Sequence, residues 1–371
     1  MNKKGKRIEW IDAARGLAMW TVVYMHIMGY CMDVIAYSPP YSFLTTYFIP
    51  GFFVISGYVT KLYESFDHNL LRDSTWKKTL QLLIPTVVFI IIYALTKDIA
   101  IKDMVFHPSK KGYWFTLCLY EMYIVFYCIV SICLMIKANR KFYSILLACL
   151  IIFTIALSHY INANVDWASP TSPLWLKISG IVNLIDCLPY FLLGVILKEY
   201  DKYFKKIIGG YGGYKYITVA LFFCILMTYF TPIIPSKISA MIHVIVVFSV
   251  LYSLFENSNN IRCPYFNKLL NAFTIIGNNT LEIYFLHYFM LFTPPLIISQ
   301  YLNNVINATV EKCSVTIPEL LIVGSIAFLI CYLCIVFSTI LKQIPYIGAI
   351  CFGEKWSYQS INVDRSLKIQ Q

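Results

Sequence analysis

Long apolar stretches recur along almost the whole chain, from Ile11 to Leu341. Each is close to the ~20 residues that a helix needs to cross a hydrocarbon core of about 30 Å. Hydrophobic residues make up 59% of the chain and charged residues only 13%, whereas soluble domains average about 25% charged residues. The sequence therefore predicts an all-α integral membrane protein and excludes a separate water-soluble catalytic domain.

The number of stretches of this length predicts about ten transmembrane helices in one bundle. They cover residues 11–30, 45–63, 80–97, 113–136, 142–160, 178–197, 215–231, 236–255, 281–301 and 317–341. We expect residues 1–345 to form this ten-helix membrane domain and residues 346–371 to form a short cytoplasmic tail.

The basic residues predict how the bundle is oriented. The chain has a formal net charge of +11, and Lys and Arg of multi-pass proteins collect in cytoplasmic loops. Most of these residues fall in segments on the same side as the two termini, so both termini are predicted to be cytoplasmic. This accounts for the charge without a nucleic-acid partner, and we expect a multi-pass protein of the inner or plasma membrane in contact with membrane lipid.

The cysteines do not indicate a metal site. Most of the 12 lie inside apolar runs without paired spacing. Cys331 and Cys334 form a C-x-x-C pair, but no histidine accompanies them and their neighbours are typical of a lipid-embedded helix. We therefore expect no bound metal.

Asp12, Arg15 and His26 place three polar groups in the first predicted span, where each charged residue costs about 2.5–3.5 kcal/mol at mid-helix. His26 follows Arg15 by an eleven-residue step, which returns to within about 20° of the same helix face and rises roughly 16 Å. One interpretation is an interfacial ion pair plus a histidine that bonds a neighbouring helix. The other is a polar path, in which a guanidinium holds an anionic oxygen and an imidazole moves protons.

Several motifs now resemble those of a known family, the membrane-bound acyltransferase-3 family. Residues 11–26, of the form I-D-x-x-R-G-x-A with a histidine at R-x(10)-H, resemble its opening. Residues 49–58, I-P-G-F-F-V-I-S-G-Y, are similar to its second-span motif. Further similarities follow in the expected order at residues 82–85, 113–115 and 279–287, the last reading N-T-L-E-I-Y-F-L-H.

The resemblance implies a ten-helix inner-membrane enzyme that moves an acyl group, most often acetyl from acetyl-CoA, onto hydroxyls of carbohydrates such as surface polysaccharides or their lipid-linked precursors. It also implies that His26 and Arg15 occupy the positions of the essential histidine and basic residue. A sugar hydroxyl needs a base to accept its proton as it attacks a thioester. His26 is the predicted general base and Arg15 the predicted donor-binding or site-organising group, and a covalent acyl-histidine remains open.

The donor, acyl-CoA, is expected as a co-substrate rather than a tightly bound cofactor. Arg72, Lys77 and Lys78, in the inner loop before the third span, are candidates for binding its phosphates. The loop lacks the R-x-x-R pair common in the family, and a positive-inside loop without a ligand is the alternative. Glu121 lies in an otherwise apolar span, where a carboxylate is costly, and is a candidate for orienting His26 or a substrate hydroxyl.

Four further residues are candidates for lining the substrate cavity. Phe52 and Phe53 are predicted to line it for the donor's apolar tail, with ordinary packing as the alternative. Tyr284 and His287 lie one helical turn apart and are predicted to face the substrate, with a structural hydrogen bond as the alternative. A different function also stays open: a transporter or flippase for a lipid-linked glycan, in which the polar stripe lines a path without bond making.

Overall fold

The computed structural model describes residues 8–31, 39–107, 109–165, 173, 178–209, 236–256, 264–291, 300, 304, 317–344 and 346–353. Within these ranges the chain is helical and contains no strand, which confirms the predicted all-α fold. The helices are α1 Glu9–His26, α2 Pro39–Tyr58, α3 His68–Lys78, α4 Ile84–Thr96, α5 Ile101–Phe106, α6 Trp114–Met135, α7 Arg140–Asn164, α9 Ile181–Glu199, α10 Asp201–Gly209, α12 Ser236–Glu256, α13 Pro264–Asn278, α14 Thr280–Met290, α16 Ile317–Leu341 and α17 Ile347–Phe352.

Among the described residues, six helices are long and apolar enough to cross a membrane. They are the continuous helix His68–Thr96, which joins α3 to α4, together with α6, α7, α9, and most of α12 and α16. The predicted seventh span, 215–231, and most of residues 292–301 of the predicted ninth lie outside the described residues. The count of ten spans and the side of the termini stay predictions.

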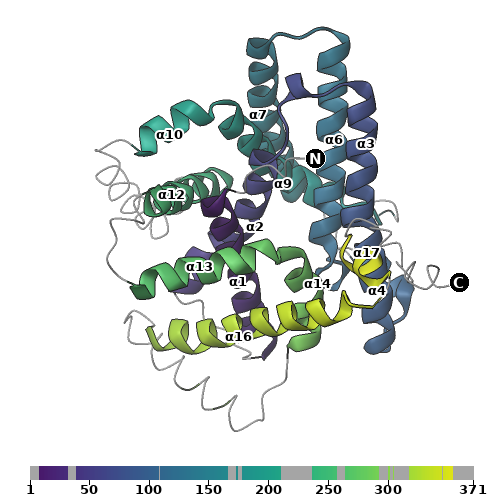
Figure 1. Ribbon diagram of the computed structural model, residues 1–371. Helices are drawn as coiled ribbons and strands as arrows, with labels where there is room; N and C mark the ends of the chain where they lie inside the picture. Colours follow the sequence, from purple (N-terminus) through teal and green to yellow (C-terminus); the bar gives the residue numbers. More distant parts are fainter. Residues whose placement is uncertain are drawn as a thin grey trace, which may run out of the picture.

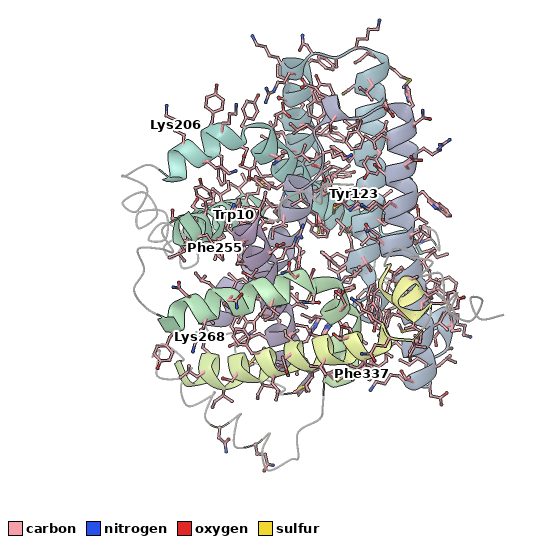
Figure 2. All side chains as sticks on the ribbon, viewed as in Figure 1. Trp10, Tyr123, Lys206, Phe255, Lys268 and Phe337 are labelled. Carbon is pink, nitrogen blue, oxygen red and sulfur yellow. The ribbon has the colours of Figure 1, made fainter. Side chains whose placement is uncertain are left out.

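The first helix, α1, lies at the centre of the helix packing. It contacts α2, α12, α13, α14 and α16, and Ala13, Ala14 and Ala18 on it are fully buried. In the view of Figure 1, α3, α6 and α7 run upright, whereas α12, α13 and α16 run across the molecule. Trp10, labelled in Figure 2, is one anchor of α1: its ring packs edge-on against Tyr252 of α12. The helix that carries the predicted polar stripe is therefore enclosed by other helices.

Glycines let two pairs of helices cross with their backbones in contact. A Cβ on Gly16 of α1 would lie 1.8 Å from the carbonyl oxygen of Phe273 on α13, and one on Gly277 would lie 1.7 Å from that of Asp12. Gly57 of α2 and Gly194 of α9 form a second crossing, where each Cβ would lie 2.0 Å from a carbonyl oxygen of the other helix. Small residues allow such close approach in membrane bundles. The first crossing fixes α1 against α13 and so positions Asp12 and Arg15.

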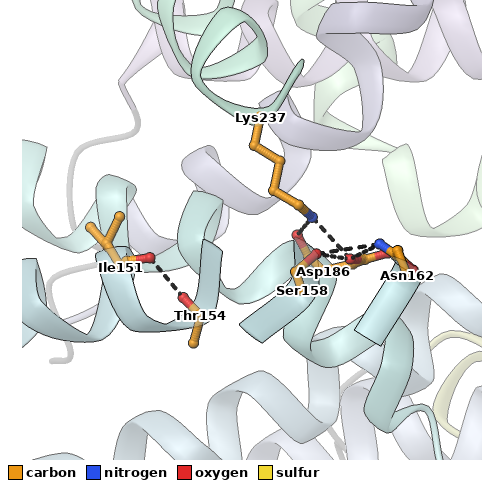
Figure 3. Close-up of polar contacts among 6 residues, drawn as sticks. All are labelled: Ile151, Thr154, Ser158, Asn162, Asp186 and Lys237. Carbon is orange, nitrogen blue, oxygen red and sulfur yellow. Dashed lines mark hydrogen bonds and ion pairs between the residues drawn. The ribbon is translucent and has the colours of Figure 1, made fainter. Parts of the chain in front are cut away.

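A polar cluster joins α7, α9 and α12, as Figure 3 shows. Asp186 of α9 accepts hydrogen bonds at its Oδ1 from Ser158 and from Asn162 of α7, the latter at 3.1 Å. Lys237 at the start of α12 donates to the same oxygen and to the Asp186 carbonyl oxygen, each at 2.9 Å. One carboxylate thus links three helices.

Replacing Asp186 with alanine is expected to destabilise the protein by about 1–2 kcal/mol, because several interhelical bonds of about 0.6 kcal/mol each are lost and the partly buried Lys237 loses its counter-ion. Thermal unfolding in detergent would measure the change. The control is Asp73→Ala, since Asp73 pairs only across an exposed surface, with side-chain exposures of 78% for Arg72 and 69% for Asp73, and such pairs contribute little. Equal melting temperatures for the two variants would contradict the prediction.

Candidate functional site

Arg15 lies between two adjoining cavities of about 410 and 300 Å³ and lines both. Its Nη1 lies 3.5 Å from Oδ1 of Asp12, one turn earlier on α1, and the Arg15 side chain keeps 30% of its surface exposed. Asp12 lines the larger cavity, together with Glu282 and Asn278. The predicted pair of Asp12 and Arg15 is therefore present, and the partly exposed Arg15 side chain contributes to the walls of both cavities.

The wall of the smaller cavity is mainly apolar and carries two basic side chains, those of Arg15 and Lys78. Lys78, at the end of α3, lines it and places its Nζ 3.9 Å from the ring centroid of Tyr123 on α6, a residue labelled in Figure 2. Phe52 of α2 and Tyr284 of α14 also line it. The fold thus brings four of the predicted residues, Arg15, Phe52, Lys78 and Tyr284, from four helices to one cavity.

Part of the predicted cytoplasmic tail contributes to the same cavity. Residues Ile347–Phe352 form α17, which packs on α4. Phe352 is buried, lines the smaller cavity and has its ring centroid 6.0 Å from that of Phe89. Lys342, just before this segment, donates a hydrogen bond from Nζ to Oε1 of Glu282 at 2.6 Å. The described part of the predicted tail, up to Gly353, thus packs against α4 and contributes a side chain to the cavity, and the division between membrane domain and tail stays a prediction.

His26, at the end of α1, contacts His287 on α14. His26 Nδ1 lies 2.9 Å from His287 Nε2, and the two rings are within 5° of parallel. His287 Nδ1 lies 2.9 Å from the carbonyl oxygen of Ile283, and the hydroxyl of Tyr288 lies 3.2 Å from His26 Nε2. His26 is half-buried, whereas His287 is fully buried. The two predicted histidines thus form one hydrogen-bonded pair.

The histidine pair follows, along α1 and α14, the residues that line the smaller cavity. Along α14 the cavity is lined by Thr280, Leu281 and Tyr284, and His287 follows Tyr284 by one turn, or ~4.5 Å of rise. Along α1 the cavity is lined by Arg15 and Met19, and His26 follows further along the same helix. Neither histidine lines the cavity itself. On both helices the histidine therefore follows the cavity-lining residues, and on α1 the order is Arg15, Met19 and His26.

Besides the two histidines, four predicted site residues line neither cavity. Arg72 and Lys77 are exposed on α3, and Nε of Arg72 lies 3.5 Å from Oδ1 of Asp73. Phe53 is buried with its ring 4.8 Å from that of Phe115. Glu121 accepts a hydrogen bond from the backbone N–H of Gly180 at 3.1 Å, which ties α6 to the residue before α9. The structure gives Glu121 this partner rather than His26.

Sequence analysis did not name Gln81, Thr280, Tyr288 or Phe352, which the structure places at the smaller cavity or at the histidine pair. Thr280 and Tyr288 share a helix face with Tyr284, because they lie four residues before and after it. That spacing could have identified them from the sequence. For Phe352, the only indication in the sequence was the apolar run that follows the last predicted span.

Comparison with curated proteins and with solved structures finds no match. A family model described as an acyltransferase domain, that of the acyltransferase-3 family, matches residues 8–336. The match includes every element that lines the two cavities except α17, and it confirms the resemblance carried by the motifs. With its long apolar helices and this match over most of its length, the chain is a membrane protein and belongs to the acyltransferase-3 family.

Proposed function

We propose that the protein transfers an acyl group, with acetyl as the expected one, from acyl-CoA to a carbohydrate hydroxyl. The acceptor would be a surface polysaccharide or its lipid-linked precursor, and the enzyme would act in the inner or plasma membrane with both termini in the cytoplasm. The observation that carries the proposal is the smaller cavity, whose mainly apolar wall contains Arg15 and Lys78 and also Tyr284, one turn before His287 of the histidine pair. A CoA thioester combines anionic phosphates with a less polar arm, and such a wall suits both.

In this reaction His26 acts as the general base. The acceptor O–H gives its proton to an imidazole nitrogen of His26 while its oxygen attacks the thioester carbonyl carbon. The C–S bond then breaks, and the imidazolium returns the proton to the departing CoA thiolate, so protons and charge balance. Arg15 lines both cavities. The N–H groups of its planar guanidinium can bind a phosphate of acyl-CoA or a polarised oxygen there.

Lys78 is the residue that we expect to contact the donor phosphates directly. Arg72, six residues earlier on the same helix, and Lys77, which directly precedes Lys78, are exposed and would attract the anionic donor at longer range. Phe52 and Tyr284 would line the path of the acyl arm. Phe53 would support Phe52 through the ring of Phe115, which both contact.

Lys78→Ala is expected to raise the KM for acyl-CoA about tenfold, equivalent to ~1.4 kcal/mol of binding free energy, with a smaller change in kcat. The reason is the loss of one charge-assisted contact to a phosphate. The matched control is Lys141→Ala, because Lys141 is exposed at the start of α7 and lines neither cavity. Steady-state kinetics at fixed ionic strength would check this. Equal KM values for the two variants would remove Lys78 from donor binding.

The test of the function is release of free thiol from acetyl-CoA by the purified protein in nanodiscs, with and without a glycan extract from the host. Release that depends on the extract would support an O-acyltransferase and provide an assay for identifying the acceptor. Absence of release across several acyl-CoA donors and extracts, from folded protein, would favour transport of a lipid-linked glycan. A flipping assay would then follow.

A further inference from the structure

We propose that His287 is a positioning residue that holds His26 in the tautomer with its proton on Nδ1, so that Nε2 is the atom that accepts the proton of the acceptor hydroxyl. This inference rests on the proposed function for its catalytic consequence. The tautomer itself is a property of the resting protein and can be measured without any reaction.

The argument starts at the backbone of α14. A carbonyl oxygen can only accept a hydrogen bond, so the contact of 2.9 Å between the Ile283 oxygen and His287 Nδ1 requires a proton on that nitrogen. A neutral imidazole carries one ring proton. His287 Nε2 therefore presents a lone pair.

This lone pair determines the state of His26. Because His287 Nε2 lies 2.9 Å from His26 Nδ1 and has no proton in the neutral ring, His26 must donate from Nδ1. The single ring proton of neutral His26 is then on Nδ1, so Nε2 of His26 has a lone pair. The bond between His287 and the backbone thus selects the basic atom of a residue 261 positions away in sequence.

The buried environment of His287 stabilises the hydrogen bond between His26 Nδ1 and His287 Nε2. His287 is fully buried, and its ring lies 4.2 Å from the ring of Tyr288 and 6.2 Å from that of Tyr284, centroid to centroid. Water cannot easily replace the His26 proton as the partner of a buried nitrogen, and leaving that nitrogen unpaired is costly. The partner histidine is therefore fixed in both orientation and protonation.

The opposite nitrogen of His26 faces a hydroxyl. Tyr288 lies with its hydroxyl oxygen 3.2 Å from His26 Nε2 and can donate to that lone pair. Tyr30 is 64% exposed, and the centroid of its ring lies 5.7 Å from that of the His26 ring. In the resting protein the Tyr288 hydroxyl thus marks the place where an acceptor hydroxyl would give up its proton, and an exposed aromatic ring lies beside it.

The test compares His287→Leu with His287→Gln. Leucine fills the space without accepting a hydrogen bond. The glutamine amide can accept from His26 Nδ1 through its oxygen and donate to the Ile283 carbonyl through its nitrogen. We expect kcat to fall by about 10²–10⁴-fold in the leucine variant, in line with the loss of an orienting group for a catalytic histidine, with little change in the KM for acyl-CoA. The glutamine variant should recover at least tenfold of that loss.

The matched control is His243→Leu. His243 is also buried, and its Nδ1 lies 2.7 Å from the carbonyl oxygen of Ser239 four residues earlier, but it lies on α12. A similar loss of kcat in this variant would mean that removing any buried histidine disturbs the bundle, and it would overturn the inference.

The second readout is the ¹⁵N NMR spectrum of histidine-labelled protein in lipid, which distinguishes a protonated from an unprotonated ring nitrogen. In the wild type we expect the His26 signal of an Nδ1-protonated ring, and in His287→Leu a shift toward the Nε2-protonated form. Protonation at Nε2 in the wild type would overturn the inference whatever the assay shows. The expected tautomer in a protein that never releases thiol would instead leave His287 as the positioning partner and refute the proposed function.

Discussion

Replacing His26 with alanine is expected to lower acyl transfer by at least about 10²–10⁴-fold, the usual contribution of a positioned general base. The acceptor hydroxyl would then have no group to take its proton at neutral pH. Folding should persist, because His26 is half-buried at the end of α1 and, among the described residues, its polar side-chain contacts are those with His287 and Tyr288. The measurement is acceptor-dependent thiol release at matched protein levels, with thermal unfolding recorded on the same samples.

The control for this variant is His107→Ala. His107 lies outside the apolar helices, where partial burial and then the charges of Lys111 and Lys110 lower its pKa. Its Nδ1 is hydrogen-bonded to the Ser109 hydroxyl. Its loss should leave transfer unchanged. Wild-type transfer by the His26 variant would remove this residue from the mechanism and, with it, the catalytic part of the role inferred for His287.

Gly277→Ala is expected to produce the largest loss of stability, about 3 kcal/mol or more, and to reduce activity as well. The new methyl carbon would lie 1.7 Å from the carbonyl oxygen of Asp12, a backbone atom that cannot rotate away, so α1 and α13 must separate. Overpacking of this kind commonly costs 1–3 kcal/mol where side chains can adjust, and here they cannot. Separation would also displace Arg15, one turn beyond Asp12, from the two cavities.

Thermal or SDS-induced unfolding in a lipid mimetic would measure this effect. Gly29→Ala is the matched control, because a Cβ at Gly29 would have no atom of the described part of the chain within 4 Å. The reciprocal variant Gly16→Ala should resemble Gly277→Ala, since its Cβ would lie 1.8 Å from the Phe273 oxygen. A Gly277 variant that melts like the Gly29 variant would contradict the close crossing of α1 and α13.

The sequence was most informative where a property belongs to one helix. Apolar length predicted the helical membrane fold, and the eleven-residue step placed Arg15 and His26 on one face of α1, as their helix confirms. The motifs identified the family, which the match over residues 8–336 confirms. Periodicity determines which residues of a helix share a face, because the helix geometry is fixed.

Only the tertiary structure decided which faces meet. The substrate role predicted for His287 and the role predicted for Glu121, orienting His26 or a substrate hydroxyl, stay predictions. What packing adds is that His287 contacts His26 and that Glu121 accepts from the backbone of Gly180. The tertiary structure likewise shows that Gly16 and Gly277 are contact points between helix backbones. It also shows that Phe352, in the predicted tail, lines a cavity. Such pairings depend on how side chains of distant segments fill space together, and no local pattern of spacing or charge in a single segment encodes that fit.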